Sequence, residues 1–263
     1  MYQKIFAAAL AATVLTAAPA SAQATGTIVG HIKITGKALA NPMIRMGADP
    51  MCGKMNPTRP RQEIVVAGPD GSLANAFVHV TGAFPAAAGE PQTVVLAQKN
   101  CMYSPRVIGV RAGQAVSIRN DDNLIHNVHG LSTRGQEFNI SQPKAGMVYK
   151  ATLKNEEVMV HVKCDIHAWM NAYIGVVPNA FYAVTDGGGA FTIANVPPGK
   201  RTVSVWHERY GPLTGTVDVK AGQKATLELT YPGAAAQKAV ADVREIVVPA
   251  DATEILIQAS TSE

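Results

Sequence analysis

Three side chains that bind soft metals lie close together in the spacing Cys164-x2-His167-x2-Met170. Thiolate and thioether sulfurs suit Cu(I), whereas imidazole nitrogens also suit Cu(II). A set of two histidines, one cysteine and a weakly bound axial methionine is typical of mononuclear copper centres that transfer electrons. The spacing therefore predicts a copper site on one short loop, completed by a histidine from elsewhere in the chain.

We expect that histidine at the end of a distant strand, because one short loop cannot surround a metal ion alone. His126 follows the alternating segment Ala115–Asn120. Alternate residues of an extended segment share a face, so His126 lies with Val128, and His129 lies on the opposite face. We choose His126 as the ligand and keep His129 as the alternative. Asn127 is expected to hydrogen-bond across to the cysteine loop and hold the two ligand segments together.

The segment before Cys164 reads as a strand with one apolar face. Alternation places Val158, Val160, Val162 and Cys164 on the face toward the core. His161 falls on the opposite face and is therefore excluded from the metal site. Cys164 is expected at the inner end of this strand, immediately before the loop that carries the other ligands.

The segment from Gln98 to Val177 resembles the cupredoxins, the plastocyanin-type blue-copper proteins. His126-Asn127-Val128 is similar to the family's His-Asn-Val at its first ligand, and Cys164-x2-His167 matches the plastocyanin spacing. Met170 departs from that spacing, with two residues after the histidine in place of four, and this shorter loop is similar to that of amicyanins. The resemblance implies a Greek-key β-sandwich that binds one copper ion and transfers electrons. The implied ligands are His126, Cys164, His167 and Met170.

The chain has three cysteines, and an odd number in an oxidising compartment leaves one thiol for another role. With Cys164 assigned to the metal, Cys52 and Cys101 are expected to form a disulfide. The alternative is a second site for Cu(I), because four methionines flank Cys52. Methionine also fills irregular gaps in protein cores. The four are Met43, Met46, Met51 and Met55.

A second block, residues 180–232, resembles the carboxypeptidase regulatory-like module, a small transthyretin-like β-sandwich. The resemblance rests on Thr185-Asp186, Gly189-x-Phe191-x-Ile193 and Val196-Pro197-Pro198-Gly199, and it implies a scaffold or interaction unit. Only part of the module is matched. The candidate for its missing opening strand is Gly26–Ile32, which would nest the cupredoxin-like segment inside the module. His207 and Glu208 read as a surface pair.

Short alternating runs bounded by Gly, Pro, Asn and Asp predict an all-β protein. The expected organisation is a signal peptide at 1–22, a cupredoxin-like domain at 23–179, a regulatory-like domain at 180–232, and a linker and tail at 233–263. Gly130–Gly146 is the one region expected to be helical or irregular.

The N-terminus has the pattern of a secretory signal. Lys4 precedes the apolar run Ile5–Leu15, and Ala20-Ser21-Ala22 fits a cleavage site before Gln23. We therefore expect a periplasmic or secreted protein with no membrane span after cleavage. A formal net charge of +4 is too small to indicate a nucleic-acid partner.

Electron transfer to a periplasmic redox partner is the leading prediction. The chain offers no nucleophile, phosphate loop or carboxylate pair at useful spacing, so no enzymatic activity is expected. One alternative is a copper carrier or storage protein without electron transfer. The other is a metal-free envelope scaffold that binds carbohydrate or protein.

Overall fold

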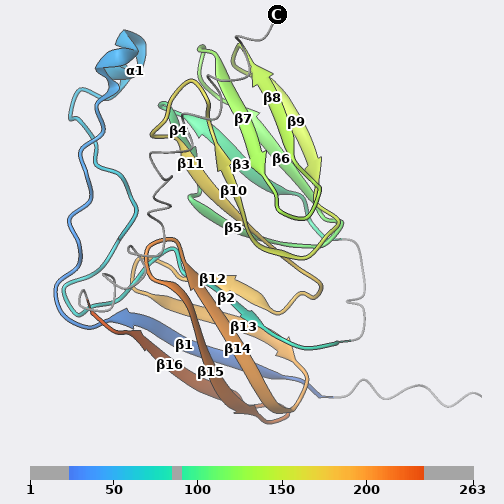
Figure 1. Cartoon of the computed structure of the whole chain (residues 1–263). Helices are drawn as coiled ribbons and strands as arrows, with labels where there is room; N and C mark the ends of the chain where they lie inside the picture. Colours follow the sequence, from blue (N-terminus) through green and yellow to red (C-terminus); the bar gives the residue numbers. More distant parts are fainter. Residues whose placement is uncertain (1–23, 85–90, 234–263) are drawn as a thin grey trace, which may run out of the picture.

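The computed structural model describes residues 24–84 and 91–233 (Figure 1). Within these ranges the chain forms two β-sandwiches and one short α-helix, so the predicted all-β class is confirmed. The predicted signal segment, residues 1–22, and all but the first residue of the predicted tail, residues 233–263, lie outside the described residues. No helix of the described residues is long and apolar enough to cross a membrane.

One sandwich, which we call the inserted sandwich, is built from a continuous stretch of the chain. Its two sheets have the strand orders β5-β11-β10-β7-β8 and β4-β3-β6-β9. Alternating apolar residues from both sheets, such as Leu96, Ile118 and Ile174, fill a fully buried core. The strands are β3 (Val94–Lys99), β4 (Met102–Ser104), β5 (Val107–Arg111), β6 (Ala115–Asn120), β7 (His126–Leu131), β8 (Phe138–Gln142), β9 (Val148–Thr152), β10 (Glu157–Lys163) and β11 (Asn171–Val177).

The other sandwich, which we call the host sandwich, combines strands from both ends of the described chain. Its sheets have the orders β13-β1-β16 and β12-β2-β14-β15, and in Figure 1 the blue β1 lies beside the red β16. The strands are β1 (Gly26–Ile34), β2 (Phe77–Val80), β12 (Tyr182–Val184), β13 (Ala190–Val196), β14 (Gly199–His207), β15 (Gly211–Val219) and β16 (Lys224–Tyr231).

Strand pairing divides the chain differently from the boundary predicted at residue 180. β1 is the central strand of its sheet, antiparallel to β13 and parallel to β16. Without it, both neighbours would lose the backbone partners that buried N–H and C=O groups require. The domain predicted as 23–179 is therefore not one unit: β1 and β2 belong to the host sandwich, and the nested arrangement is the one observed.

A second correction concerns the region expected to be helical or irregular, Gly130–Gly146. Its middle is the strand β8, which pairs with β7 as an antiparallel neighbour, whereas residues 132–137 and 143–146 are irregular, as expected. The helical turns lie instead between β1 and β2, as the 3-10 turn η1 (Met46–Ala48) and the helix α1 (Pro50–Met55). Asp49 caps α1 by accepting hydrogen bonds from two backbone N–H groups, and Pro50 begins the helix at a position that needs no N–H donor.

The two sandwiches meet through a small apolar cluster and one buried ion pair. Phe77 of the host sandwich packs with Val107 and Val177. Gly175 must be glycine there, because a Cβ atom would come within 2.5 Å of the Phe77 ring. Arg106 donates two hydrogen bonds to the buried Glu208 at 2.9 Å each. Glu208 is therefore an interface residue, and the predicted surface pair with His207 is wrong.

Candidate metal centre

Two neighbouring strands and one loop bring the predicted ligands together. His126 begins β7, Cys164 directly follows β10, and these strands are antiparallel partners. The loop after Cys164 is closed by two backbone hydrogen bonds, from Met170 to the His167 carbonyl and from Cys164 to the Met170 carbonyl. This turn holds His167 and Met170 beside the strand end that carries Cys164.

The predicted strand faces are correct near the site and wrong further from it. His126 and Val128 are buried while Asn127 and His129 are partly exposed, as alternation requires. Val160, Val162 and Cys164 also point inward, but Val158 is exposed. The pairing of β10 with β11 shifts register before Val160, which turns the strand and leaves Val158 on the outer face.

The ligand cluster is compact and shielded from solvent. One ligand atom from each of His126, Cys164 and His167 lies within 4.8 Å of the others. The two Nδ1 atoms are 3.1 Å apart, and the Cys164 Sγ is 3.8 Å from the His167 Nδ1. These three residues and Met170 are each at most 2 % exposed. Met170 belongs to the same buried cluster as Cys164.

Each histidine has an aspartate against its outer nitrogen. His126 Nε2 is 2.9 Å from an Asp122 carboxylate oxygen, and His167 Nε2 is 3.1 Å from one of Asp49. An ionised carboxylate only accepts hydrogen bonds, so both Nε2 atoms donate and both Nδ1 lone pairs face each other. Two lone pairs at 3.1 Å repel unless a proton or a cation lies with them. The donor arrangement therefore fits a metal ion held by two Nδ1 atoms and a thiolate.

The charges inside the cluster favour a cation there, either a proton or a metal ion. Burial alone would raise the pKa of Cys164, but the His126 imidazole and the backbone N–H groups of Asn127, His167 and Ile166 outweigh it and lower the pKa from 9.0 to about 7. Burial likewise opposes the charged form of His126, yet Asp122 and Cys164 raise its pKa from 6.5 to about 9. A metal ion therefore competes with protons that the free site holds.

The aspartates respond to the same contacts. Burial opposes ionisation of Asp122, but hydrogen bonds from His126 and from the backbone of Cys101 and Asn100 keep its pKa below 3.8. The hydrogen bond from His167 is the largest cause that lowers the pKa of Asp49. Both carboxylates are therefore the acceptors that the histidine orientation requires.

Further polar contacts tie the two ligand segments together, as predicted for Asn127. Its backbone N–H donates to Cys164 Sγ at 3.3 Å, and its side-chain oxygen accepts from the Asp165 backbone at 3.0 Å. The hydroxyl of Tyr103 donates to the carbonyls of Asn127 and Lys163 at 2.7 and 3.3 Å. These bonds fix the separation between the start of β7 and the end of β10.

The remaining histidine candidates lie apart from the cluster. The ring of His129 is within 3.1 Å of Asp165 on the opposite face of β7. It therefore points away from Cys164 and His167, and His126 is the histidine that meets them. The ring of His161 stacks on Tyr173 and meets Asn171 at 2.7 Å. Neither side chain belongs to the cluster that holds Cys164 and His167.

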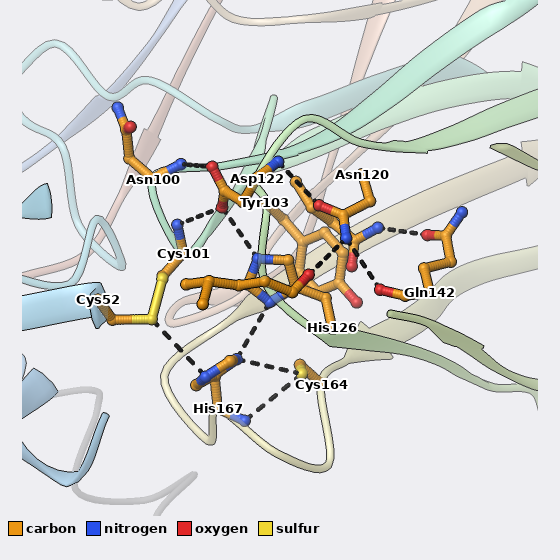
Figure 2. A network of polar contacts seen from close by, with 12 residues as sticks. Cys52, Asn100, Cys101, Tyr103, Asn120, Asp122, His126, Gln142, Cys164 and His167 are labelled. Atoms are coloured by element: carbon orange, nitrogen blue, oxygen red, sulfur yellow. Dashed lines mark hydrogen bonds and ion pairs between the residues drawn. A yellow bond between two sulfur atoms is a disulfide. The ribbon is translucent and has the colours of Figure 1, made fainter. Parts of the chain in front are cut away.

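The Cys52–Cys101 disulfide is present, with the two Cα atoms 5.7 Å apart, and Cys164 is the free cysteine. Its position was not expected: Cys52 Sγ lies 3.6 Å from His167 Nε2. Figure 2 shows the disulfide and the Asp122 carboxylate around the two histidines. Because both sulfurs are bonded to each other, neither Cys52 nor Cys101 offers a thiolate to a metal. The methionines around Cys52 divide: Met43 and Met51 are exposed, whereas Met46 is buried in the core.

Three residues of this centre were not expected from the sequence: Asp49, Asp122 and Tyr103. Asp122 lies four residues before His126. This spacing brings two side chains together on a helix, but it predicts no contact in a turn between strands. Asp49 before Pro50 has the pattern of a helix cap, which predicts its bonds to α1 but not its contact with His167. No local pattern places Tyr103 against the ligand strands.

No family model matches the sequence, and no curated protein matches it. About a third of the chain is similar in structure to cupredoxins. A purple cupredoxin from Nitrosopumilus maritimus aligns at 20% identity and TM-score 0.28, covering 32% of this chain and 98% of that one. Amicyanin from Paracoccus versutus aligns at 21% and 0.29, covering 38% and 96%.

A copper-containing nitrite reductase from Thermus scotoductus aligns at 24% identity and TM-score 0.29, covering 36% of this chain and 24% of the reductase. These scores add no weight to the assignment of the site, which rests on the geometry of the ligands. The resemblance of the host sandwich to a regulatory-like module stays a prediction.

Proposed function

We propose that this chain is an exported, non-enzymatic copper protein that carries electrons through one mononuclear site. The observation that carries the proposal is the buried convergence of His126, Cys164 and His167. Met170, buried on the same turn, would supply a thioether sulfur as the fourth ligand. When bound, copper supplies a one-electron couple between Cu(I) and Cu(II).

Hydrogen bonds from the surrounding residues hold the side chains of the cluster in place and would keep them there in both oxidation states of a bound copper ion. Backbone N–H groups of Asn127 and His167 donate to Cys164 Sγ at 3.3 and 3.4 Å, which stabilises the thiolate. Asp122 and Asp49 orient the two imidazoles from outside. Ligands fixed in advance need little rearrangement when the metal changes charge, and this is the property that rapid electron exchange requires.

Burial of all four ligands favours a resident copper ion over a transported one. A carrier must offer its metal to an incoming ligand, whereas here each ligand is at most 2 % exposed. Electron transfer does not require the metal to leave the protein. The carrier role therefore ranks second, and it predicts binding of Cu(I) that is much tighter than binding of Cu(II), with no reversible potential on an electrode.

Export is supported by the disulfide between Cys52 and Cys101, because such bonds persist in oxidising compartments. The proposed partner is a redox protein of the same compartment. Neither nucleic acid nor a membrane is proposed as a partner.

The test is metal analysis and visible spectroscopy of the exported protein, as isolated and after oxidation. We expect one copper per chain and an intense visible band in the oxidised protein. Cys164→Ser should abolish the band, whereas Cys101 and Cys52 remain bonded and unaffected. A band that persists in Cys164→Ser contradicts the ligand assignment. Protein that contains no copper and gains no thermal stability from it supports the metal-free scaffold.

A further inference from the structure

The segment between β1 and β2 lies against the ligand cluster although it belongs to neither sandwich. We call residues 43–62 the cover segment. Figure 1 shows this excursion leaving the host sandwich and carrying α1 along the inserted sandwich. Its side chains Ile44, Met46 and Cys52 are buried in the same apolar cluster as Cys164. The cover segment is therefore packed onto the inserted sandwich rather than onto its own strands.

Asp49 of the cover segment makes two kinds of contact with one carboxylate. Its Oδ1 accepts hydrogen bonds from the backbone N–H groups of Met51 and Cys52 at 2.9 and 3.1 Å, which caps α1. Its Oδ2 accepts from His167 Nε2 at 3.1 Å. The orientation of the imidazole and the start of the helix are thus coupled through a single side chain.

Several bonds hold the cover segment in place beside His167. The disulfide joins Cys52 to Cys101 of the inserted sandwich. Asn56 Nδ2 donates to the carbonyl of Asn100 at 3.0 Å, and Gln62 Nε2 donates to that of Trp169 at 3.2 Å. These bonds lie at the middle and at the C-terminal end of the segment, so its position is defined along most of its length.

The disulfide also connects the supports of the two histidines. The backbone N–H of Cys101 donates to Asp122 Oδ2 at 2.8 Å, and the same oxygen accepts from His126 Nε2. On the other side, the N–H of Cys52 donates to Asp49. Figure 2 shows the Asp122 half of this arrangement, with the disulfide lying between Asp122 and His167. Each half of the disulfide therefore holds the aspartate that orients one imidazole.

We propose that Asp49 is a positioning residue for His167, and that the cover segment separates the metal site from metal ligands in solution. The inference rests on the proposed function, because it concerns exchange of the copper. His167 is 1 % exposed, and its outer nitrogen faces Asp49 and the disulfide. External chelators therefore reach the site only after the cover segment is displaced.

The first test uses the full-length, metal-free protein and does not depend on copper. Diethyl pyrocarbonate acylates accessible imidazoles, and mass spectrometry of tryptic peptides assigns the sites. His167 is the one histidine between Lys163 and Lys200, and His31, with a side chain 47% exposed, is the internal standard. We expect His167 to react at least about tenfold more slowly than His31, because reaction requires local opening. Equal rates overturn the proposal.

Two variants test the disulfide and the Asp49 carboxylate of the cover segment separately. Cys52→Ser/Cys101→Ser removes the tether and should accelerate acylation of His167 relative to His31. Asp49→Asn retains a capping side chain for α1 but replaces the carboxylate beside His167, so it keeps the proposal testable if the double variant fails to fold. A rate at His167 that is unchanged in the folded variants overturns the proposal.

The second test measures removal of Cu(I) from the loaded protein by a coloured chelator in excess. Asp49→Asn should speed removal by about 10–100-fold, if the loss of affinity that usually follows removal of a carboxylate orienting a ligand histidine is expressed in the rate of release, and it should shift the visible spectrum. Asp49→Glu should restore both in part. The matched control is Asp186→Asn, because Asp186 accepts the backbone N–H groups of Gly188 and Ala190 in a turn of the host sandwich.

Failure of this inference is distinguishable from failure of the proposed function. If no copper binds, the proposed function fails, while acylation of His167 still reports whether the cover is closed. If copper binds and Asp49→Asn releases it at the wild-type rate with an unchanged spectrum, Asp49 has no positioning role. A protected His167 together with faster release in Asp49→Asn supports the inference.

Discussion

Each sandwich contains a fully buried histidine, and the two are in opposite electrostatic environments. His126 of the inserted sandwich lies beside the Asp122 carboxylate and the Cys164 thiol, which together raise its pKa to about 9 against the effect of burial. His207 of the host sandwich lies between Tyr210 and Tyr231. Burial first, and then the charge of Arg106, lowers its pKa to about 3.

The difference shows that burial does not make a histidine a metal ligand. His207 accepts one hydrogen bond at Nδ1 from the Arg209 backbone, and its Nε2 has no hydrogen-bond partner among the described residues. It is a neutral packing residue. His126 differs because its outer nitrogen has a carboxylate acceptor and its inner nitrogen faces a second imidazole. The neighbours, rather than the depth of burial, define the site.

Replacement of one histidine from each sandwich provides the largest contrast. His126→Gln should abolish one-to-one copper binding, because one of the two imidazole nitrogens of the cluster is lost, whereas His207→Gln should leave the stoichiometry unchanged. His129→Ala is a second control, since His129 faces Asp165 on the other side of β7. Copper per chain after dialysis is the measurement. Full loading of His126→Gln would show that the two buried histidines do not differ in function.

Loss of the disulfide should destabilise the inserted sandwich more than the host sandwich. The bond closes a separation of 49 residues, so Cys52→Ser/Cys101→Ser should lower the free energy of unfolding by about 4 kcal/mol in the chain-entropy model. The fluorescence of the two tryptophans follows the two sandwiches separately, because Trp169 packs in the inserted sandwich and Trp206 lies on β14 of the host sandwich. Denaturant titrations of Trp169→Phe and Trp206→Phe backgrounds isolate each signal. Equal losses in both signals would indicate a single cooperative unit.

Replacement of Asp122, the aspartate that distinguishes His126 from His207, should have the next largest effect, on the affinity for copper. Asp122→Asn should weaken copper binding by about 10–100-fold, because the imidazole loses a charged acceptor. Asp186→Asn, in the host sandwich, should leave the affinity unchanged. Competition with a chelator of known affinity measures both. An affinity that is the same in the two variants would contradict the role assigned to the Asp122 contact.

His207 should make the stability of the host sandwich depend on pH. Its pKa is about 3 in the folded protein and 6.5 when unperturbed, so below pH 6.5 the unfolded chain binds a proton that the folded chain excludes. Stability should therefore fall as the pH decreases, by about 2 kcal/mol between pH 6.5 and 4.5 from this residue.

His207→Phe removes this titration and keeps an aromatic ring beside Tyr210. The free energy of unfolding, followed by Trp206 fluorescence, should therefore have a flatter pH dependence in the variant than in the wild type. The slope is the measurement, because the absolute stability also changes when the hydrogen bond from Arg209 is lost. Identical slopes would mean that His207 binds a proton equally well in both states.

Most strands were predictable because alternation is a local property. Ala115–Asn120 was predicted with the bounds that β6 has, and its apolar residues point inward. β8 was missed as a strand because it carries polar residues at several positions, including Gln142, whose buried side chain donates to the carbonyl of Ile118, 24 residues earlier in the chain. The helix α1 was missed because it is short and contains Gly53, and its position depends on a disulfide and a cap.

The sequence by itself predicted which side chains converge, because Cys164, His167 and Met170 lie on one turn and alternation places His126 on the inner face of an extended segment. It also determined the disulfide partners, by their number. Only the tertiary structure decided that β1 completes the host sandwich and that Asp49 and Asp122 orient the two histidines. Those contacts join segments far apart in the chain, and their register depends on how both sandwiches pack.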